Sequence, residues 1–220
     1  MWETAWIIGG GNSLPRQFGV PENVIRQVTS KAKPITAYSR YMKEIHSANV
    51  IGVNIAFMLG RWISAMVFED MSFLSAYWRQ LLRFKNLKIT SIESIDRDYV
   101  EVARNVKRMR RDYRAGLCDD PDMLCWNHNS GASAIDLAAH FGARRIILLG
   151  FDMQSDNGRT HWHEGFQNYE RKTIQKSFDR FIERFPYIAR DARKRGIEIL
   201  NVNDNSAIKE FKQVKLKDVL

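Results

Sequence analysis

Short apolar runs separated by longer amphipathic segments recur along the 220-residue chain. The runs are apolar on consecutive positions rather than on alternate ones, which is typical of strands that are buried on both faces. The predicted strands cover residues 5–8, 50–53, 65–68, 87–90, 145–150 and 197–202. Because such strands need helices against both faces, the pattern predicts an α/β fold with a mostly parallel sheet flanked by helices.

The segments between the runs have the spacing of helices. The Ala-rich stretch 132–141 stops before Gly142, and glycine is the residue preferred just after a helix end. Apolar residues three and four apart predict further helices over 99–113 and 174–185, and Pro186 begins one that Gly196 ends. No repeat and no linker rich in Pro, Gly or Ser interrupts the chain, so we expect a single domain over residues 1–220.

Composition narrows the class of protein. With 45% hydrophobic and 27% charged residues the chain can bury a core, which excludes a disordered or fibrous protein. The longest apolar stretch, 50–58, contains Asn54 and is shorter than the roughly 20 residues of a membrane helix. The first residues lack the basic leader of a signal peptide, so we expect a cytoplasmic protein without a membrane span. Cys118 and Cys125 have no second pair, which indicates neither a disulfide framework nor a four-ligand zinc site.

The net charge of +9 points to polyanionic partners such as nucleotides or nucleic acid, although solubility alone also explains it. In the predicted helix 99–113 basic residues lie opposite the apolar ones. We interpret this stripe as a patch for an anionic partner or acceptor, with a solvated outer face as the alternative. Its members are Arg104, Lys107, Arg108, Arg111 and Arg114.

A glycine-rich loop follows the first predicted strand. Gly9, Gly10 and Gly11 let the backbone approach a phosphate or ribose closely, and Asn12 and Ser13 add polar groups. The loop has neither the lysine of a P-loop nor the spacing of the dinucleotide-binding fingerprint. A tight turn therefore remains the alternative to a nucleotide-binding loop.

Other polar residues follow strand ends or precede the Ala-rich helix. In an open parallel sheet, ligands bind beyond the carboxyl ends of the strands, where an acidic side chain often accepts from a ribose hydroxyl. A helix start also attracts anions, and simple helix capping is the alternative for both kinds of position. The candidates are Asn54, Asp70, Asn129, Ser130, Gly131, Gly150 and Asp152.

The richest chemical cluster is His161-Trp162-His163-Glu164. A histidine with a pKa near 6.5 can take a proton from an acceptor hydroxyl, so His161 and His163 are candidate general bases. Their spacing lacks the i, i+4 pattern of helical zinc ligands and no third ligand is assigned, so we predict no metal. Two incidental loop histidines are the alternative. Asn157-Gly158 predicts a sharp turn in a loop that acts as a lid.

Several of these segments, taken together, resemble one superfamily. They are residues 9–14, Val53-Asn54, 68–70, 129–152, His161-Trp162-His163 and 196–201. The resemblance covers residues 6–220, and 129–152 is its most specific part. The superfamily consists of Rossmann-like transferases, many of them encoded by phages or bacteria. It includes the bacterial CMP-sialic-acid-dependent sialyltransferases and 6-hydroxymethylpterin pyrophosphokinase-like proteins of unknown function.

The resemblance implies that residues 10–13 and Asn54 hold a nucleotide and that Ser130 and Gly131 cradle phosphate or sugar. It makes His161 or His163 the base. We therefore expect a nucleotide-sugar-dependent glycosyltransferase that moves a sugar from a CMP-linked donor to an acceptor hydroxyl, without an obligatory metal. The loop before His161 is shorter than the lid subdomain of the sialyltransferases, and their phosphate-contacting tyrosine pair has no assigned counterpart.

Two alternatives keep the fold and change the chemistry. One is an ATP-dependent pyrophosphokinase-like transferase, which requires Mg²⁺ and carboxylate ligands. The other is a nucleic-acid-associated, DNA-modifying phage protein that uses the basic stripe. The expected partners are thus a nucleotide donor and a hydroxyl-bearing acceptor, with nucleic acid as one candidate acceptor and a second copy of the chain as a candidate partner.

Overall fold

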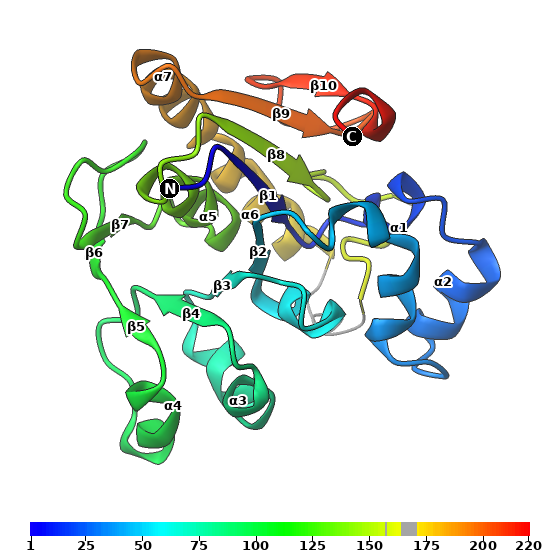
Figure 1. Ribbon diagram of the computed structural model, residues 1–220, viewed down its shortest axis with the longest axis horizontal. Coiled ribbons are helices and arrows are strands. Elements are labelled where there is room, and N and C mark those ends of the chain that lie inside the picture. Colours follow the sequence, from blue (N-terminus) through cyan, green and yellow to red (C-terminus); the bar gives the residue numbers. More distant parts are fainter. Residues whose placement is uncertain (157, 164–170) are drawn as a thin grey trace.

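Eight parallel strands form the sheet in this computed structural model, which describes residues 1–156, 158–163 and 171–220, with 171–175 as backbone only. The strand order is β10-β9-β8-β1-β2-β3-β4-β5 (Figure 1). Their bounds are β1 Thr4–Ile8, β2 Val50–Val53, β3 Ala65–Val67, β4 Leu87–Thr90, β5 Lys107–Arg108, β8 Arg145–Leu149, β9 Glu198–Val202 and β10 Lys212–Val214. The mostly parallel sheet flanked by helices is confirmed, and each predicted strand lies within about one residue of an observed one.

The order of strands reverses direction at β1. From β1 the chain adds β2, β3, β4 and β5 on one side, and then returns to place β8, β9 and β10 on the other side. The connections that leave the carboxyl ends of β1 and β8 therefore run toward opposite halves of the sheet. In open α/β sheets such a switch point leaves a crevice at the carboxyl edge.

Helices cover both faces of the sheet because alternate residues of its central strands point to opposite sides. Trp6 and Ile8 of β1 belong to the core that α2 and α3 cover, whereas Ala5 and Ile7 belong to the core that α5 and α7 cover. The helix bounds are α1 Leu14–Gln17, α2 Glu22–Thr29, α3 Met71–Arg83, α4 Val100–Arg104, α5 Ser130–His140, α6 Arg171–Ile182 and α7 Phe185–Lys194. Short 3₁₀ helices cover Ile35–Tyr41, Lys43–Ile45, Asn54–Leu59, Arg97–Tyr99 and Leu216–Asp218.

Several helix ends agree with the sequence prediction. Gly142 follows α5 with φ +86° and Gly196 follows α7 with φ +63°, the left-handed conformation in which glycine is favoured. Pro186 lies in the first turn of α7, where its missing N–H has no helical partner to lose.

The predicted helix over 99–113 is wrong. It stops after α4, and the chain continues as β5 and β6 (Arg110–Asp112); β6 pairs with β7 (Met123–Cys125) in a separate two-stranded sheet. Lys107 pairs with Ile89 at the edge of the main sheet. The basic residues of this segment would lie one turn apart on a helix, and such like charges destabilise it. Pairing with the sheet therefore decides the structure here despite the helical spacing of the apolar residues.

No helix in the part of the chain that the structure describes is both long and apolar enough to cross a bilayer.

Candidate functional site

A cavity of about 230 Å³ opens at the carboxyl edge of the sheet, at the switch point between β1 and β8. The loops after β1, β2, β3 and β8, the start of α5, the loop with the two histidines and α6 all contribute to it. Its lining includes Gly9, Gly10, Gly11, Val53, Asn54, Asp70, Trp126, His128, Asn129, Ser130, Gly131, Gly150, Phe151, Asp152, Met153, Thr160, His161, His163, Phe178, Arg180 and Phe181. The structure thus brings together nearly all the residues that the sequence placed at one site, although their binding roles stay predictions.

The glycine loop holds the histidine segment directly. The Trp162 amide donates to the Gly10 carbonyl at 3.1 Å, and the Trp162 indole N–H donates to the Gly9 carbonyl at 2.8 Å. A Cβ on Gly10 would lie 2.7 Å from Cδ2 of His161, well inside van der Waals contact. Glycine at position 10 therefore leaves the space that the imidazole occupies, and a larger residue would displace the ring.

Asp152 fastens the same loop from the other side. Its carboxylate accepts from the Ser13 amide at 2.8 Å, from the Ser13 hydroxyl at 2.5 Å and from the Asn203 amide at 2.7 Å. Burial raises the pKa of Asp152, and these hydrogen bonds oppose the rise. A Cβ on Gly11 would lie 2.5 Å from both Asp152 Cγ and the Gly150 carbonyl oxygen. Asp152 is thus built into the scaffold of the cavity.

The side chains of Asn12 and Ser13 bind other residues of the protein and, within the described structure, do not line the cavity as they would in a phosphate-binding loop. The Ser13 hydroxyl proton goes to Asp152, and the Asn12 amide donates to Asp156 at 3.5 Å. Neither residue is among those that line the cavity in the described part of the chain. Ser13 instead lines a neighbouring depression with Arg16. Direct contact of these two side chains with a nucleotide stays a prediction.

Two asparagines that line the cavity each carry a buried polar atom that lacks a partner within the described residues. Asn129 caps α5 through Oδ1, which accepts from the Gly131 amide at 2.7 Å and the Ala132 amide at 3.4 Å. The Nδ2 of Asn129 and the Oδ1 of Asn54 are both buried without a hydrogen-bond partner there. Buried polar atoms are rarely left in this state, so a donor and an acceptor remain for a ligand.

Backbone strain gathers at the same place. Five non-glycine residues among those described have positive φ, and three of them line the cavity: Asn54 at +50°, His128 at +58° and Met153 at +50°. Such conformations persist only where the surrounding structure enforces them, and they cluster at functional sites.

The two histidines are uncharged at neutral pH. Burial lowers the pKa of His161 to about 4 and the pKa of His163 well below its usual value, and repulsion between the two rings when His161 is protonated lowers the pKa of His163 further. The Thr160 hydroxyl contacts His161 Nδ1 at 2.8 Å, and the two imidazole centroids are 5.2 Å apart. Both rings are therefore in the form that accepts a proton. Of the neighbouring predictions, Asn157 in the turn and Glu164 beside His163 lie outside the described residues.

Of the two acidic residues that follow β3, Asp70 is exposed and Glu69 is buried. Asp70 lies at the N-cap position of α3, makes no side-chain cap hydrogen bond within the described structure, and lines the cavity. Glu69 is buried, and burial raises its pKa to about 7 against the opposing hydrogen bond from Ser91 and the charge of Arg111. Arg111 reaches Glu69 Oε2 at 3.1 Å and lies 4.6 Å over the ring of Trp126, a cavity residue.

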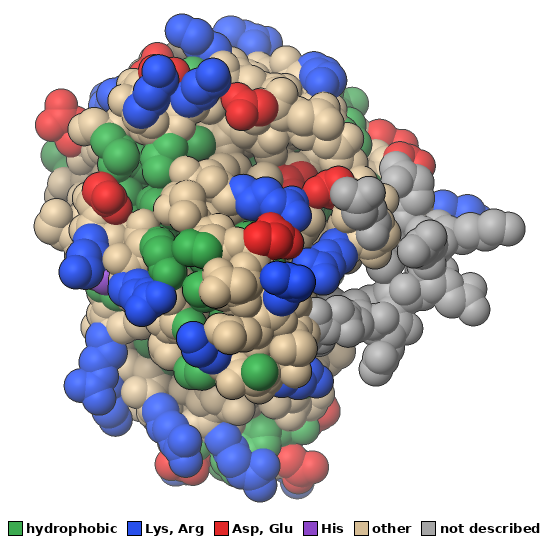
Figure 2. All heavy atoms as spheres, turned by 90° about the vertical axis from the view of Figure 1, so that its right-hand side faces the viewer, with side chains coloured by type: hydrophobic (Ala, Val, Ile, Leu, Met, Phe, Trp, Pro, Cys, Tyr) green, Lys and Arg blue, Asp and Glu red, His purple; other side chains and the backbone are tan. Residues whose placement is uncertain are grey.

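The predicted basic stripe is not a single helix face, which corrects the interpretation of it as one patch. Arg111 turns inward to Glu69, and Arg114 pairs with Asp112 at 2.7 Å. Arg104 lies on α4, while Lys107 and Arg108 are exposed on β5 at the edge of the sheet, where charge discourages pairing with another chain. On the face around α1 and α2, Lys and Arg side chains are scattered among acidic ones (Figure 2).

Sequence reasoning missed part of the cavity. Trp126 and His128 directly precede the helix start that it did identify, and the aromatic and basic residues of α6 enter the cavity from far along the chain. Arg180 and Arg184 also lower the pKa of His128, after burial, which places positive charge near this wall. The missed residues are Trp126, His128, Thr160, Phe178, Arg180 and Phe181.

No family model matches the sequence, and a search of curated proteins finds no similar sequence. Among solved structures, the fold is similar to the sialyltransferase CstII from Campylobacter jejuni in complex with the substrate analogue cytidine-5'-monophosphate. The TM-score is 0.51 at 13% identity, over 97% of this chain and 85% of that one. A CST-II variant in complex with CMP gives a TM-score of 0.50 at 14% identity, over 96% and 86% of the two chains.

These similarities define a sialyltransferase-like α/β fold that extends over almost the whole chain. The pyrophosphokinase-like and phage-related parts of the sequence resemblance find no support in them.

Proposed function

We propose that the chain is a glycosyltransferase that transfers a sugar from a nucleotide donor, CMP-linked in the first instance, to a hydroxyl acceptor. The observation that carries the proposal is the cavity at the switch point, where an unpartnered donor, an unpartnered acceptor and two neutral histidines meet. The similar fold of structures that contain CMP supports the choice of nucleotide.

The donor nucleotide lies between the glycine loop and the start of α5 in this proposal. Asn129 Nδ2 donates to a nucleotide oxygen, and Asn54 Oδ1 accepts from a ribose hydroxyl or the base amine. The N–H group of Ser130 and the guanidinium of Arg180 face developing negative charge on the leaving phosphate, beside the Gly131 amide that Asn129 caps. Asp70 is placed to accept from the ribose.

His161 acts as the base because its ring is less enclosed than that of His163, which is only 3% exposed. The acceptor oxygen attacks the anomeric carbon, its proton passes to the neutral His161 imidazole, and the bond to the phosphate oxygen breaks so that CMP leaves with the electron pair. The negative donor phosphate raises the pKa of His161 in the complex, which strengthens the base when substrate is bound. His163 holds the ring of His161 from behind.

The test measures CMP release from CMP-sialic acid, with UDP- and GDP-sugars as parallel donors. Where no acceptor is added, water takes that place and the donor is hydrolysed. We expect release from the CMP donor, loss of turnover in His161→Ala with CMP binding retained, and a smaller loss in His163→Ala. Thermal shift with CMP, UDP, GDP, ADP and ATP reports binding independently. Stabilisation by ATP with Mg²⁺ and none by CMP would overturn the assignment in favour of phosphoryl transfer.

A further inference from the structure

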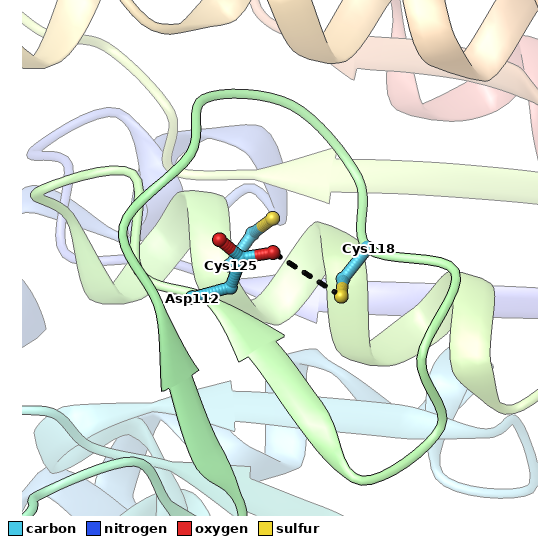
Figure 3. Close-up of side chains that lie close together, drawn as sticks. All are labelled: Asp112, Cys118 and Cys125. Carbon is cyan, nitrogen blue, oxygen red and sulfur yellow. Dashed lines mark hydrogen bonds between the residues drawn. The ribbon is translucent and has the colours of Figure 1, made fainter.

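A second chemical cluster lies away from the cavity, in the small sheet of β6 and β7. Asp112 ends β6, Cys125 ends β7 as its register partner, and Cys118 lies on the loop between the strands. The carboxylate oxygen and the two sulfur atoms all lie within 4.8 Å of one another, and the three residues are buried (Figure 3).

One buried carboxylate positions both cysteines. Asp136 of α5 is fully buried and accepts from the Cys118 amide through Oδ1 and from the Cys125 amide through Oδ2, each at 2.8 Å. The loop is thereby folded back so that Cys118 faces the strand ends (Figure 3). The cluster is thus fixed by the backbone rather than by chance contact of mobile side chains.

The distances suit a tetrahedral metal ion with sulfur and oxygen ligands. With Zn–S near 2.3 Å and Zn–O near 2.0 Å, tetrahedral geometry separates a sulfur and an oxygen ligand by about 3.5 Å. The Cys118 sulfur and Asp112 Oδ2 lie 3.4 Å apart. The remaining pairs, within 4.8 Å, need a shift of about 1 Å to reach the roughly 3.8 Å expected between two thiolates on zinc.

Zinc binding would require both thiols to lose their protons. Two thiolates and the Asp112 carboxylate would then carry three negative charges around the two positive charges of the ion. Arg114 donates to both Asp112 oxygens, from its backbone amide to Oδ1 at 2.9 Å and from Nη2 to Oδ2 at 2.7 Å, so a bound ion must displace its side chain, which is 76% exposed.

We propose that Asp112, Cys118 and Cys125 form a binding site for one zinc ion, with water as the fourth ligand. Of the three proposed ligands, Cys125 lines a second cavity, of about 360 Å³, together with Arg114 and Asp119, so an ion and its water would enter from the side of Cys125. The two spaced cysteines alone do not make such a site, and the parallel pairing of β6 with β7 adds Asp112 as the third ligand. Because β7 leads directly into Trp126 and the start of α5, the ion would brace one wall of the candidate active site.

The experiment uses the full chain, reduced and freed of metal with a chelator, and titrates it with Zn²⁺ and with Co²⁺ as a spectroscopic substitute. We expect one ion per chain, a thiolate-to-Co²⁺ charge-transfer band, and release of about two protons from the thiols on binding. The chain has only two cysteines, so the band reports on this site alone.

Variants separate the ligands from their neighbours. Cys118→Ser and Cys125→Ser should abolish the thiolate band, and Asp112→Asn should weaken zinc binding by about tenfold or more, whereas Arg114→Met should retain it. If the cysteine variants do not fold, the wild-type band and proton count decide. The proposal is overturned if the reduced wild type shows no thiolate band with Co²⁺, or if the double cysteine variant binds zinc as tightly as the wild type does.

Discussion

Gly10→Ala is the sharpest single test of how the glycine loop acts, because the new methyl group meets one catalytic candidate and little else. Its Cβ would lie 2.7 Å from Cδ2 and 3.3 Å from Nε2 of His161. Gly10 is not among the glycines with positive φ, so alanine meets no backbone penalty of that kind. The ring must therefore move by about 1 Å to regain a normal contact of roughly 3.5–4.0 Å.

A displacement of about 1 Å in a catalytic group can lower the rate by roughly 100-fold, which corresponds to about 2.7 kcal/mol of activation free energy. We expect Gly10→Ala to reduce the rate of CMP release from CMP-sialic acid by this factor. The affinity for CMP, measured by calorimetry, and the melting temperature should change little because a side chain can move aside.

Gly11→Ala is the matched comparison. Its Cβ would lie 2.5 Å from the Gly150 carbonyl oxygen, which is backbone and cannot move aside, so this variant should mainly lose stability. The reasoning is refuted if Gly10→Ala is folded and binds CMP but turns over at the wild-type rate. It is equally refuted if the folded Gly10→Ala protein loses CMP binding, because the loop would then act through the ligand and not through His161.

Three further predictions follow from hydrogen bonds and pKa values. The acidic limb of kcat/KM should lie near pH 4 rather than 6.5, because His161 acts while neutral and burial lowers its pKa to about 4. The acidic limb of kcat should lie at higher pH than that of kcat/KM, because the bound donor raises the pKa of His161. A pH–rate series that shows the kcat/KM limb near 6.5 would contradict the lowered pKa. Asn129→Asp should keep the α5 cap and lose CMP affinity, whereas Asn129→Ala should lose both the cap and the affinity. Loss of the cap should lower the free energy of unfolding by about 1 kcal/mol in chemical denaturation, and calorimetry reports the affinity. Unchanged CMP affinity in both variants would show that Asn129 Nδ2 does not contact the nucleotide. Glu69 has a pKa of about 7 in the folded protein and about 4.5 when unfolded, so it makes the folded state lose stability as the pH rises from 4.5 to 7. Glu69→Gln should reduce this loss in denaturation curves measured across that pH range. The same pH dependence in both proteins would show that the pKa of Glu69 is not raised by folding.

Six of the eight strands of the sheet were predictable because each contains a short, largely apolar run. The strands at the two edges, β5 and β10, are polar and exposed or half-buried, and they were not predicted. The helix predicted over 99–113 was wrong because Val102, Val106 and Met109 have helical spacing without forming one helix face. Val102 is buried on α4, whereas Val106 and Met109 are buried next to β5 and β6. What decides the structure there is the edge of the sheet and the buried Glu69, which holds Arg111. Both are contacts between distant segments, which local spacing does not encode.

The candidate site was predictable where its residues follow strand ends or precede a helix, since the topology of a parallel sheet brings those positions to one edge. Arg180 on α6 could not be found this way, because a basic residue on an amphipathic helix has the pattern of an exposed one. The same limit applies to Asp112, which joins the two cysteines only through the pairing of β6 with β7. The roles of Ser13 and Asp152 in holding the loop depend on hydrogen bonds across some 139 residues of sequence.

A crystal structure of the protein grown with saturating CMP tests the central claim most directly. The account predicts CMP between the glycine loop and the first turn of α5, with Asn129 Nδ2 and Asn54 Oδ1 both in hydrogen-bond contact with it. CMP bound at another surface, or a cavity in which both asparagine atoms still lack a partner beside a bound nucleotide, would contradict it.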